Sequence, residues 1–125
     1  MYTGFQKNNT LQRLYLDHNN LFNDYLWMIE DVINTNTCLQ TLSLASCNIQ
    51  DEGMLILSDG LKINRYIHSI NLKDNSISNT GARAFIKAIS LRNGEMKYIN
   101  LANNLIATNV GSQILSEISK FRLYV

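Results

Sequence analysis

The 125-residue chain has little that would mark it as a nucleic-acid-binding or membrane protein. Eleven Lys and Arg against ten Asp and Glu give a formal net charge of +1, whereas a surface that follows phosphates normally carries a strong basic excess. The longest clearly apolar runs, such as residues 54–57, fall far short of the roughly 18–20 residues that cross a bilayer. We therefore expect neither nucleic acid nor a membrane as a partner.

Residues that could carry catalysis or bind a metal are also scarce. The chain has two cysteines and two histidines, and they do not occur at the short, fixed spacings that hold zinc. Its six glycines are scattered, and none belongs to a glycine-rich loop that would hold nucleotide phosphates. We therefore expect a protein that is not an enzyme and that binds no metal and no cofactor.

Proline is absent, whereas 17 Asn, 17 Leu and 14 Ile together make up well over a third of the chain. This bias indicates an internal repeat. A segment of the form L-x-x-L-x-L-x-x-N/C-x-L begins at residues 11, 39, 67 and 96, so the repeat is 28 or 29 residues long. Each anchor position of the four segments holds an aliphatic residue, Met, Asn or Cys.

This pattern resembles that of the leucine-rich repeat family, and its length is similar to that of the ribonuclease-inhibitor-like class. The resemblance covers residues 11–120 almost continuously. It implies an α/β solenoid, a horseshoe segment of four strand-turn-helix repeats with a parallel sheet on the concave side and helices on the convex side. No repeat can bury its apolar face alone, so neighbours stack into one core. We expect a single domain, 1–125, with repeats at about 11–38, 39–66, 67–95 and 96–125, and with residues 1–10 as the tail of a truncated preceding repeat.

The second half of each repeat is predicted to be a helix. Apolar residues lie 18 and 22 positions after each repeat start, and a spacing of four places them on one inward face. Gly53 and Gly81 share a position where a missing side chain lets the helix approach the strand turn. We expect Trp27 to pack in the core; an exposed Trp27 would mark a convex or end-on contact. The expected caps are Asn23, Asp24, Asp51, Asn79, Thr80, Thr108 and Asn109, and the inward residues are Ile29, Ile33, Leu57, Leu61, Phe85, Ile89, Ile114 and Ile118.

The first half of each repeat is predicted to be a short strand followed by a turn. Two apolar positions of each strand form core columns, and the Asn or Cys after them is expected to satisfy buried backbone groups of the turn. The three rows are Leu14, Leu42, Ile70 and Ile99; Leu16, Leu44, Leu72 and Leu101; and Asn19, Cys47, Asn75 and Asn104.

The positions just before this Asn and Cys row have the composition of a catalytic triad, since they hold His18, Ser46 and Asp74, followed by Asn103. A triad needs the imidazole between the serine and the carboxylate. Here the serine is in the middle, and His18 would lie about two strand spacings from Asp74. We therefore expect solvated residues at this row rather than hydrolytic chemistry.

Residues between the core positions of each strand are expected to face the concave side. We expect that nothing inside the fold requires these residue types, so we interpret them as a surface for a partner protein. Small residues in the central repeats would leave this surface shallow, and the mixed charges favour a polar protein surface as the ligand. The predicted partner-binding residues are Arg13, Tyr15, Asp17, His18, Ser43, Asn71, Lys73, Asp74, Tyr98 and Asn100.

The leading hypothesis is thus a non-enzymatic protein-protein interaction module. The alternative is a structural segment or isoform of a longer solenoid, which stacks or self-associates through open ends. The class resemblance also implies contexts such as nuclease inhibition, sensing in NOD-like receptors, Ran-type GTPase activation and tropomodulin-type actin capping. The balanced charge argues against nuclease inhibition, and four repeats argue against full GTPase activation.

The two cysteines also bear on where the protein is found. Cys38 precedes the second repeat's strand and Cys47 follows it, so a disulfide between them is not expected. Extracellular members of the resembled family usually carry cysteine-rich caps and repeats near 24 residues. We therefore expect reduced thiols and a cytoplasmic, intracellular location.

Overall fold

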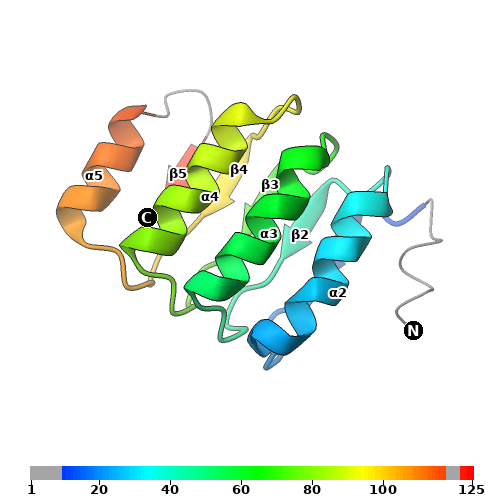
Figure 1. The fold of residues 1–125 in the computed structure, drawn as a ribbon, viewed down its shortest axis with the longest axis horizontal. Helices are drawn as coiled ribbons and strands as arrows, with labels where there is room; N and C mark the ends of the chain where they lie inside the picture. Colours follow the sequence, from blue (N-terminus) through cyan, green and yellow to red (C-terminus); the bar gives the residue numbers. More distant parts are fainter. Residues whose placement is uncertain (1–9, 118–121) are drawn as a thin grey trace.

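The computed structural model describes residues 10–117 and 122–125, in which short strands alternate with helices. Figure 1 shows the helices side by side over one face of a single sheet. The predicted α/β solenoid is confirmed. The elements are β1 (Arg13–Tyr15), α2 (Phe22–Thr35), β2 (Thr41–Ser43), α3 (Asp51–Ile63), β3 (Ser69–Asn71), α4 (Asn79–Leu91), β4 (Tyr98–Asn100), α5 (Thr108–Glu117) and β5 (Arg122–Tyr124).

The strands form one parallel sheet in the order β1-β2-β3-β4-β5. Equivalent residues of successive repeats pair directly, so Leu14 lies beside Leu42, Leu42 beside Ile70 and Ile70 beside Ile99. β5 pairs with β4 and adds a strand to the four that were predicted. This register stacks equivalent side chains at the strand spacing of roughly 4.8 Å.

The core lies between the sheet and the helices, as the repeat pattern predicts. The first strand column is buried along its whole length, and in the second only Leu16 is half-buried. On the helices, Phe85 is fully buried and Ile29 is partly buried at the first helix. Ile118 lies outside the described residues. Burial of each apolar side chain contributes about 1.5–3 kcal/mol, so the stacked columns supply most of the stability.

Asp51 and Asn79, two of the polar residues at the helix starts, do not act as the predicted caps. Asp51 and Asn79 begin α3 and α4 as expected, but their side chains reach the next repeat. Asp51 accepts hydrogen bonds from the backbone N–H of Ser78 at 2.8 Å and from its hydroxyl, and Asn79 accepts one from the backbone N–H of Ala107 at 2.8 Å. These oxygens satisfy N–H groups where the next helix begins, because stacking places those groups within reach. The expected caps Asn23 and Asp24 lie outside the described side chains.

Trp27 is not a core residue, which corrects the prediction. It lies on α2 with 53% of its surface exposed. The equivalent residues of the later repeats, Leu55, Arg83 and Ser112, are exposed as well. This position points away from the sheet in every repeat, so Trp27 belongs to the convex surface. Among the described residues, no helix is long and apolar enough to span a membrane.

Candidate functional site

The Asn row after the strands has the predicted structural role in the third and fourth repeats, whereas Asn19 of the first repeat is exposed. Asn75, only 8% exposed, accepts hydrogen bonds from the backbone N–H groups of Cys47 at 3.0 Å and Ile49 at 2.9 Å. Its amide nitrogen donates to the carbonyl oxygens of Leu44 at 3.0 Å and Leu72 at 2.9 Å. One amide therefore joins two consecutive turns.

Cys47 takes the place of Asn in the second repeat. Burial raises the pKa of its thiol, so the sulfur keeps its proton and can donate to the carbonyl oxygens of Leu16 at 3.2 Å and Ala45 at 3.4 Å. Cys47 and Cys38 form no disulfide. The thiol is thus a structural donor rather than a reactive group.

A second row of buried polar side chains, where the helices end, was not predicted as a set. Asn64 donates to the carbonyl oxygens of Ile33 and Asn36 and accepts from the backbone N–H groups of Tyr66 and Ile67. In the next repeat Arg92 stands at this position, 8% exposed, and donates to the carbonyl oxygens of Ile67 and Asn64. Its Nε has no hydrogen-bond partner among the described residues, and burial lowers the pKa of its guanidinium. This row also joins repeats.

The row that resembles a triad is a set of left-handed turn residues. The φ angles of His18, Ser46, Asp74 and Asn103 are 62°, 55°, 57° and 57°. Asp74 accepts a hydrogen bond from the side chain of Asn103 at 2.8 Å. Asn, Asp and His tolerate this backbone conformation better than most residues. The turn geometry therefore accounts for His18, Asp74 and Asn103, whereas Ser46 adopts this conformation at a cost.

Replacing Ser46 with glycine is expected to raise the free energy of unfolding by about 0.5–1 kcal/mol, because the strain of a left-handed serine exceeds the entropy cost of glycine. Ser46→Val should lower it by about 1–2 kcal/mol for the same reason. Urea unfolding followed by circular dichroism measures both changes. A loss of stability in Ser46→Gly would show that the hydroxyl, not the backbone, decides this position.

Three of the predicted concave residues accept hydrogen bonds from backbone N–H groups of the fold. Asp17 accepts a hydrogen bond from the backbone N–H of Ala45 at 2.9 Å. Asn71 does the same for Lys73 at 3.1 Å and Asn100 for Ala102 at 2.9 Å. The three N–H groups lie at equivalent positions of the second, third and fourth repeats, and Asp17 reaches its partner from the preceding repeat. The expectation that nothing in the fold requires these residue types was therefore wrong, since an oxygen acceptor is needed here.

Ser43 is a second correction on this surface. It lies in β2 opposite Tyr15 but is only 3% exposed. Its hydroxyl donates to the carboxylate of Asp17 at 2.6 Å. Ser43 therefore supports Asp17, and it has no surface to offer a partner.

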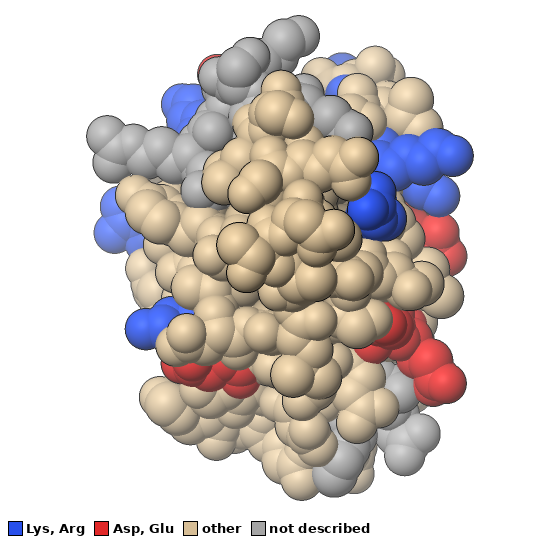
Figure 2. All heavy atoms as spheres, turned by 90° about the vertical axis from the view of Figure 1, so that its left-hand side faces the viewer, with Lys and Arg blue, Asp and Glu red and all other residues tan. Residues whose placement is uncertain are grey.

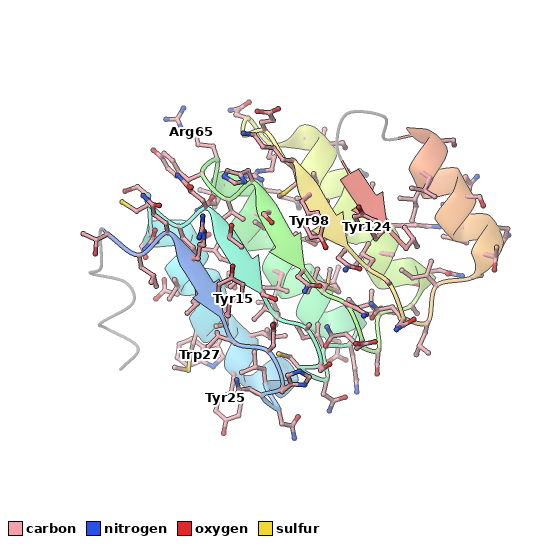
Figure 3. The ribbon with its side chains drawn as sticks, turned by 180° about the vertical axis from the view of Figure 1, so that it is seen from behind. Tyr15, Tyr25, Trp27, Arg65, Tyr98 and Tyr124 are labelled. Carbon is pink, nitrogen blue, oxygen red and sulfur yellow. The ribbon has the colours of Figure 1, made fainter. Side chains whose placement is uncertain are left out.

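Tyrosines stand at both ends of the sheet face that the helices leave uncovered (Figure 3). Tyr15, on β1, is 61% exposed. At the other end the rings of Tyr98 and Tyr124 lie 5.5 Å apart at 49°, and the amide of Asn100 donates to the Tyr98 hydroxyl at 3.2 Å. The residues between them are small and polar, namely Thr41, Ser43, Ser69 and Asn71. We call Tyr15, Thr41, Ser69, Asn71, Tyr98, Asn100 and Tyr124 the tyrosine-flanked surface.

The other predicted residues surround this surface. Figure 2 looks at the molecule from the α5 end, and there the few Lys, Arg, Asp and Glu side chains are scattered among uncharged residues. Within the described part of the chain, the one ion pair joins Lys62 and Asp59 on the helix side at 3.4 Å. No group of three potential metal ligands occurs there either. Arg13, His18 and Asp74 are exposed, and Asp17, Asn71, Lys73, Tyr98 and Asn100 are half-buried.

Comparison with known proteins finds a sequence family whose pattern the middle of this chain matches. A family model described as "Leucine Rich repeat" matches residues 35–58 and 64–85. NACHT, LRR and PYD domains-containing protein 4B of Mus musculus is 28% identical over 92 residues, which are 73% of this chain and 11% of that protein. Leiomodin-2 of Mus musculus is 28% identical over 103 residues, 81% of this chain and 18% of that protein. The chain thus spans less than a fifth of these relatives.

Solved structures share the fold along nearly the whole chain. "Leiomodin-1 Actin-Binding Site 2 (ABS2)" superposes with a TM-score of 0.86 at 19% identity, covering 98% of this chain and 75% of that one. The tropomodulin C-terminal domain of Caenorhabditis elegans gives a TM-score of 0.82 at 10% identity, covering 99% and 79%. At these identities the likeness establishes the architecture.

Proposed function

The chain belongs to the leucine-rich repeat family, and on that premise we propose that it is a non-enzymatic module that binds another protein through the concave face of its sheet. The tyrosine-flanked surface carries this proposal. Tyrosines are common anchors of protein interfaces because they bury a large area at little entropy cost. Tyr98 is held in place by Tyr124 and Asn100 before any partner arrives, which lowers the cost of binding further.

The partner's chemistry follows from the same surface. Its central residues are hydroxyls and amides, and the charged residues around it carry both signs, so a polar protein surface fits better than a polyanion. The name of one structural neighbour includes an actin-binding site, and we propose actin as the first defined partner to test. A cytoplasmic location, membership of the ribonuclease-inhibitor-like class and a single domain over 1–125 are part of this proposal.

The alternative of stacking through open ends has one observation against it. Tyr25 occupies the position of Gly53 and Gly81 in the next two repeats and is 56% exposed. At Gly81 a Cβ would lie 3.1 Å from the backbone Cα of Asp51 in the preceding helix. A helix that approached α2 as closely would meet the whole Tyr25 side chain. We therefore rank self-association second.

Simultaneous replacement of Arg13, Tyr15 and Tyr98 with alanine is expected to abolish specific binding without loss of fold, because it removes the anchors of the concave face. The immobilised protein is exposed to purified actin and, separately, to cytosolic extract whose captured proteins are identified by mass spectrometry. A matched control replaces Leu55, Lys87 and Leu91, which are exposed on the helices, with alanine. If both variants captured the same proteins in equal amounts, or if only the chain itself were captured, the stacking alternative would be favoured.

A further inference from the structure

Asp17 is a carboxylate of the concave face that two hydrogen bonds from the neighbouring repeat hold in place. It follows β1 and is half-buried. A single oxygen, Oδ1, accepts both the hydroxyl of Ser43 at 2.6 Å and the backbone N–H of Ala45 at 2.9 Å. Within the described residues no Lys, Arg or His forms an ion pair with it. No hydrogen bond to its second oxygen occurs among the described residues, and the two bonds to Oδ1 fix the orientation of the group.

The negative charge of Asp17 exceeds what the fold requires. In the third and fourth repeats the amide oxygens of Asn71 and Asn100 accept the equivalent kind of backbone N–H. A neutral oxygen acceptor is thus sufficient to satisfy this backbone N–H group. The half-buried charge has a desolvation cost that a neutral amide would avoid, and its presence points to an interaction outside the chain.

The surroundings of Asp17 suit a cation. Tyr15 precedes it by two residues on β1, lies opposite Ser43 and is 61% exposed. On the β2 side the neighbour is the small residue Ala45. A carboxylate beside an exposed aromatic ring attracts a guanidinium or ammonium group, through charge-assisted hydrogen bonds and through the ring face.

We propose that Asp17, together with Tyr15, binds a Lys or Arg side chain of the partner protein. This inference rests on the proposed function and names the chemistry that the concave face recognises at its β1 end. Other charges that accompany Asp17 on this face or its border are Arg13, His18, Lys73 and Asp74. The cations Arg13 and Lys73 would repel a strongly basic segment, so the partner contributes a single cation within a polar stretch.

The test uses a phage library of random dodecapeptides, selected on the full chain and on Asp17→Asn. Asparagine keeps the acceptor for Ser43 and Ala45 while it removes the charge. Peptides selected on the native chain are expected to be enriched in Lys or Arg at one position. The best synthetic peptide should bind Asp17→Asn about tenfold more weakly, since a charge-assisted contact is lost. Changing its cation to Met should weaken binding to the native chain but not to Asp17→Asn.

Two further variants separate this inference from the proposed function. Asp74→Asn removes an exposed carboxylate that is bonded to Asn103 and should bind as the native chain does. The Tyr98→Ala variant should bind every selected peptide more weakly than the native chain does. If Tyr98→Ala binds weakly while Asp17→Asn binds normally and no cation is enriched, the cation site is wrong and the binding face remains. If no peptide is selected, or if none depends on Tyr98, both proposals fall.

Discussion

Replacing Asn75 with alanine is expected to lower the free energy of unfolding by about 3–5 kcal/mol, because each buried polar group that is left unpaired costs about 1–3 kcal/mol. The side chain serves the N–H groups of Cys47 and Ile49 and the carbonyls of Leu44 and Leu72. Alanine cannot replace any of these four bonds. The substitution would remove the hydrogen bonds that join the turn of the second repeat to the turn of the third.

The same row supplies the controls. Asn104 accepts one N–H, from Ile77 at 3.0 Å, and is half-buried, so Asn104→Ala should cost less. Asn19 is exposed and donates to the carbonyls of Leu16 and Asp17; Asn19→Ala should change stability by less than about 1 kcal/mol. Urea unfolding of the three variants should give the order Asn75, Asn104, Asn19. Three equal losses would mean that burial does not set the cost.

Much of the architecture could be predicted because the repeat period reports burial directly. Apolar residues at the first, fourth and sixth positions of a segment that recurs after 28 or 29 residues can be buried only if the segments stack in register. The Asn row followed from the same register, since an amide is what a buried turn needs. Trp27 could have been placed correctly by this logic, because Arg83 and Ser112 at its position in later repeats indicate solvent.

The contacts between repeats were less accessible to sequence reasoning. Asp51 has the residue type and position of a helix cap, and its partner Ser78 lies 27 residues away. The direction in which such a side chain points depends on the spacing of two helices. The left-handed turn at Ser46 was missed for another reason: no glycine marks it, although His, Asp and Asn at the equivalent positions favour that conformation.

The candidate site shows a similar division. Alternation along a strand placed its residues on the concave face, but it could not tell which of them remain exposed. Ser43 is covered, and its hydroxyl is engaged by Asp17. Asn71 and Asn100 each use an oxygen for a backbone N–H. Which side chains stay exposed depends on the lengths of the side chains on neighbouring strands. Fewer concave residues are therefore exposed than were predicted to bind a partner.

Replacing Gly81 with alanine is expected to lower the free energy of unfolding by about 2–4 kcal/mol, although alanine is the better helix former. The new Cβ would lie 3.1 Å from the Cα of Asp51 and closer still to its carboxylate. That carboxylate also holds the backbone N–H and the hydroxyl of Ser78. The substitution therefore pushes α3 and α4 apart and breaks the bonds that join their starts.

Gly60→Ala is the matched control for this prediction. Its Cβ would meet the Ile33 and Glu30 side chains at 3.2–3.4 Å, and such flexible groups can shift by a few tenths of an ångström. The gain in helix propensity then offsets the crowding, and stability should change by less than about 1 kcal/mol. Thermal and urea unfolding of both variants measure the contrast. If Gly81→Ala were as stable as Gly60→Ala, the helix starts would be able to separate freely, and the close approach at Gly81 would not fix the spacing of the repeats.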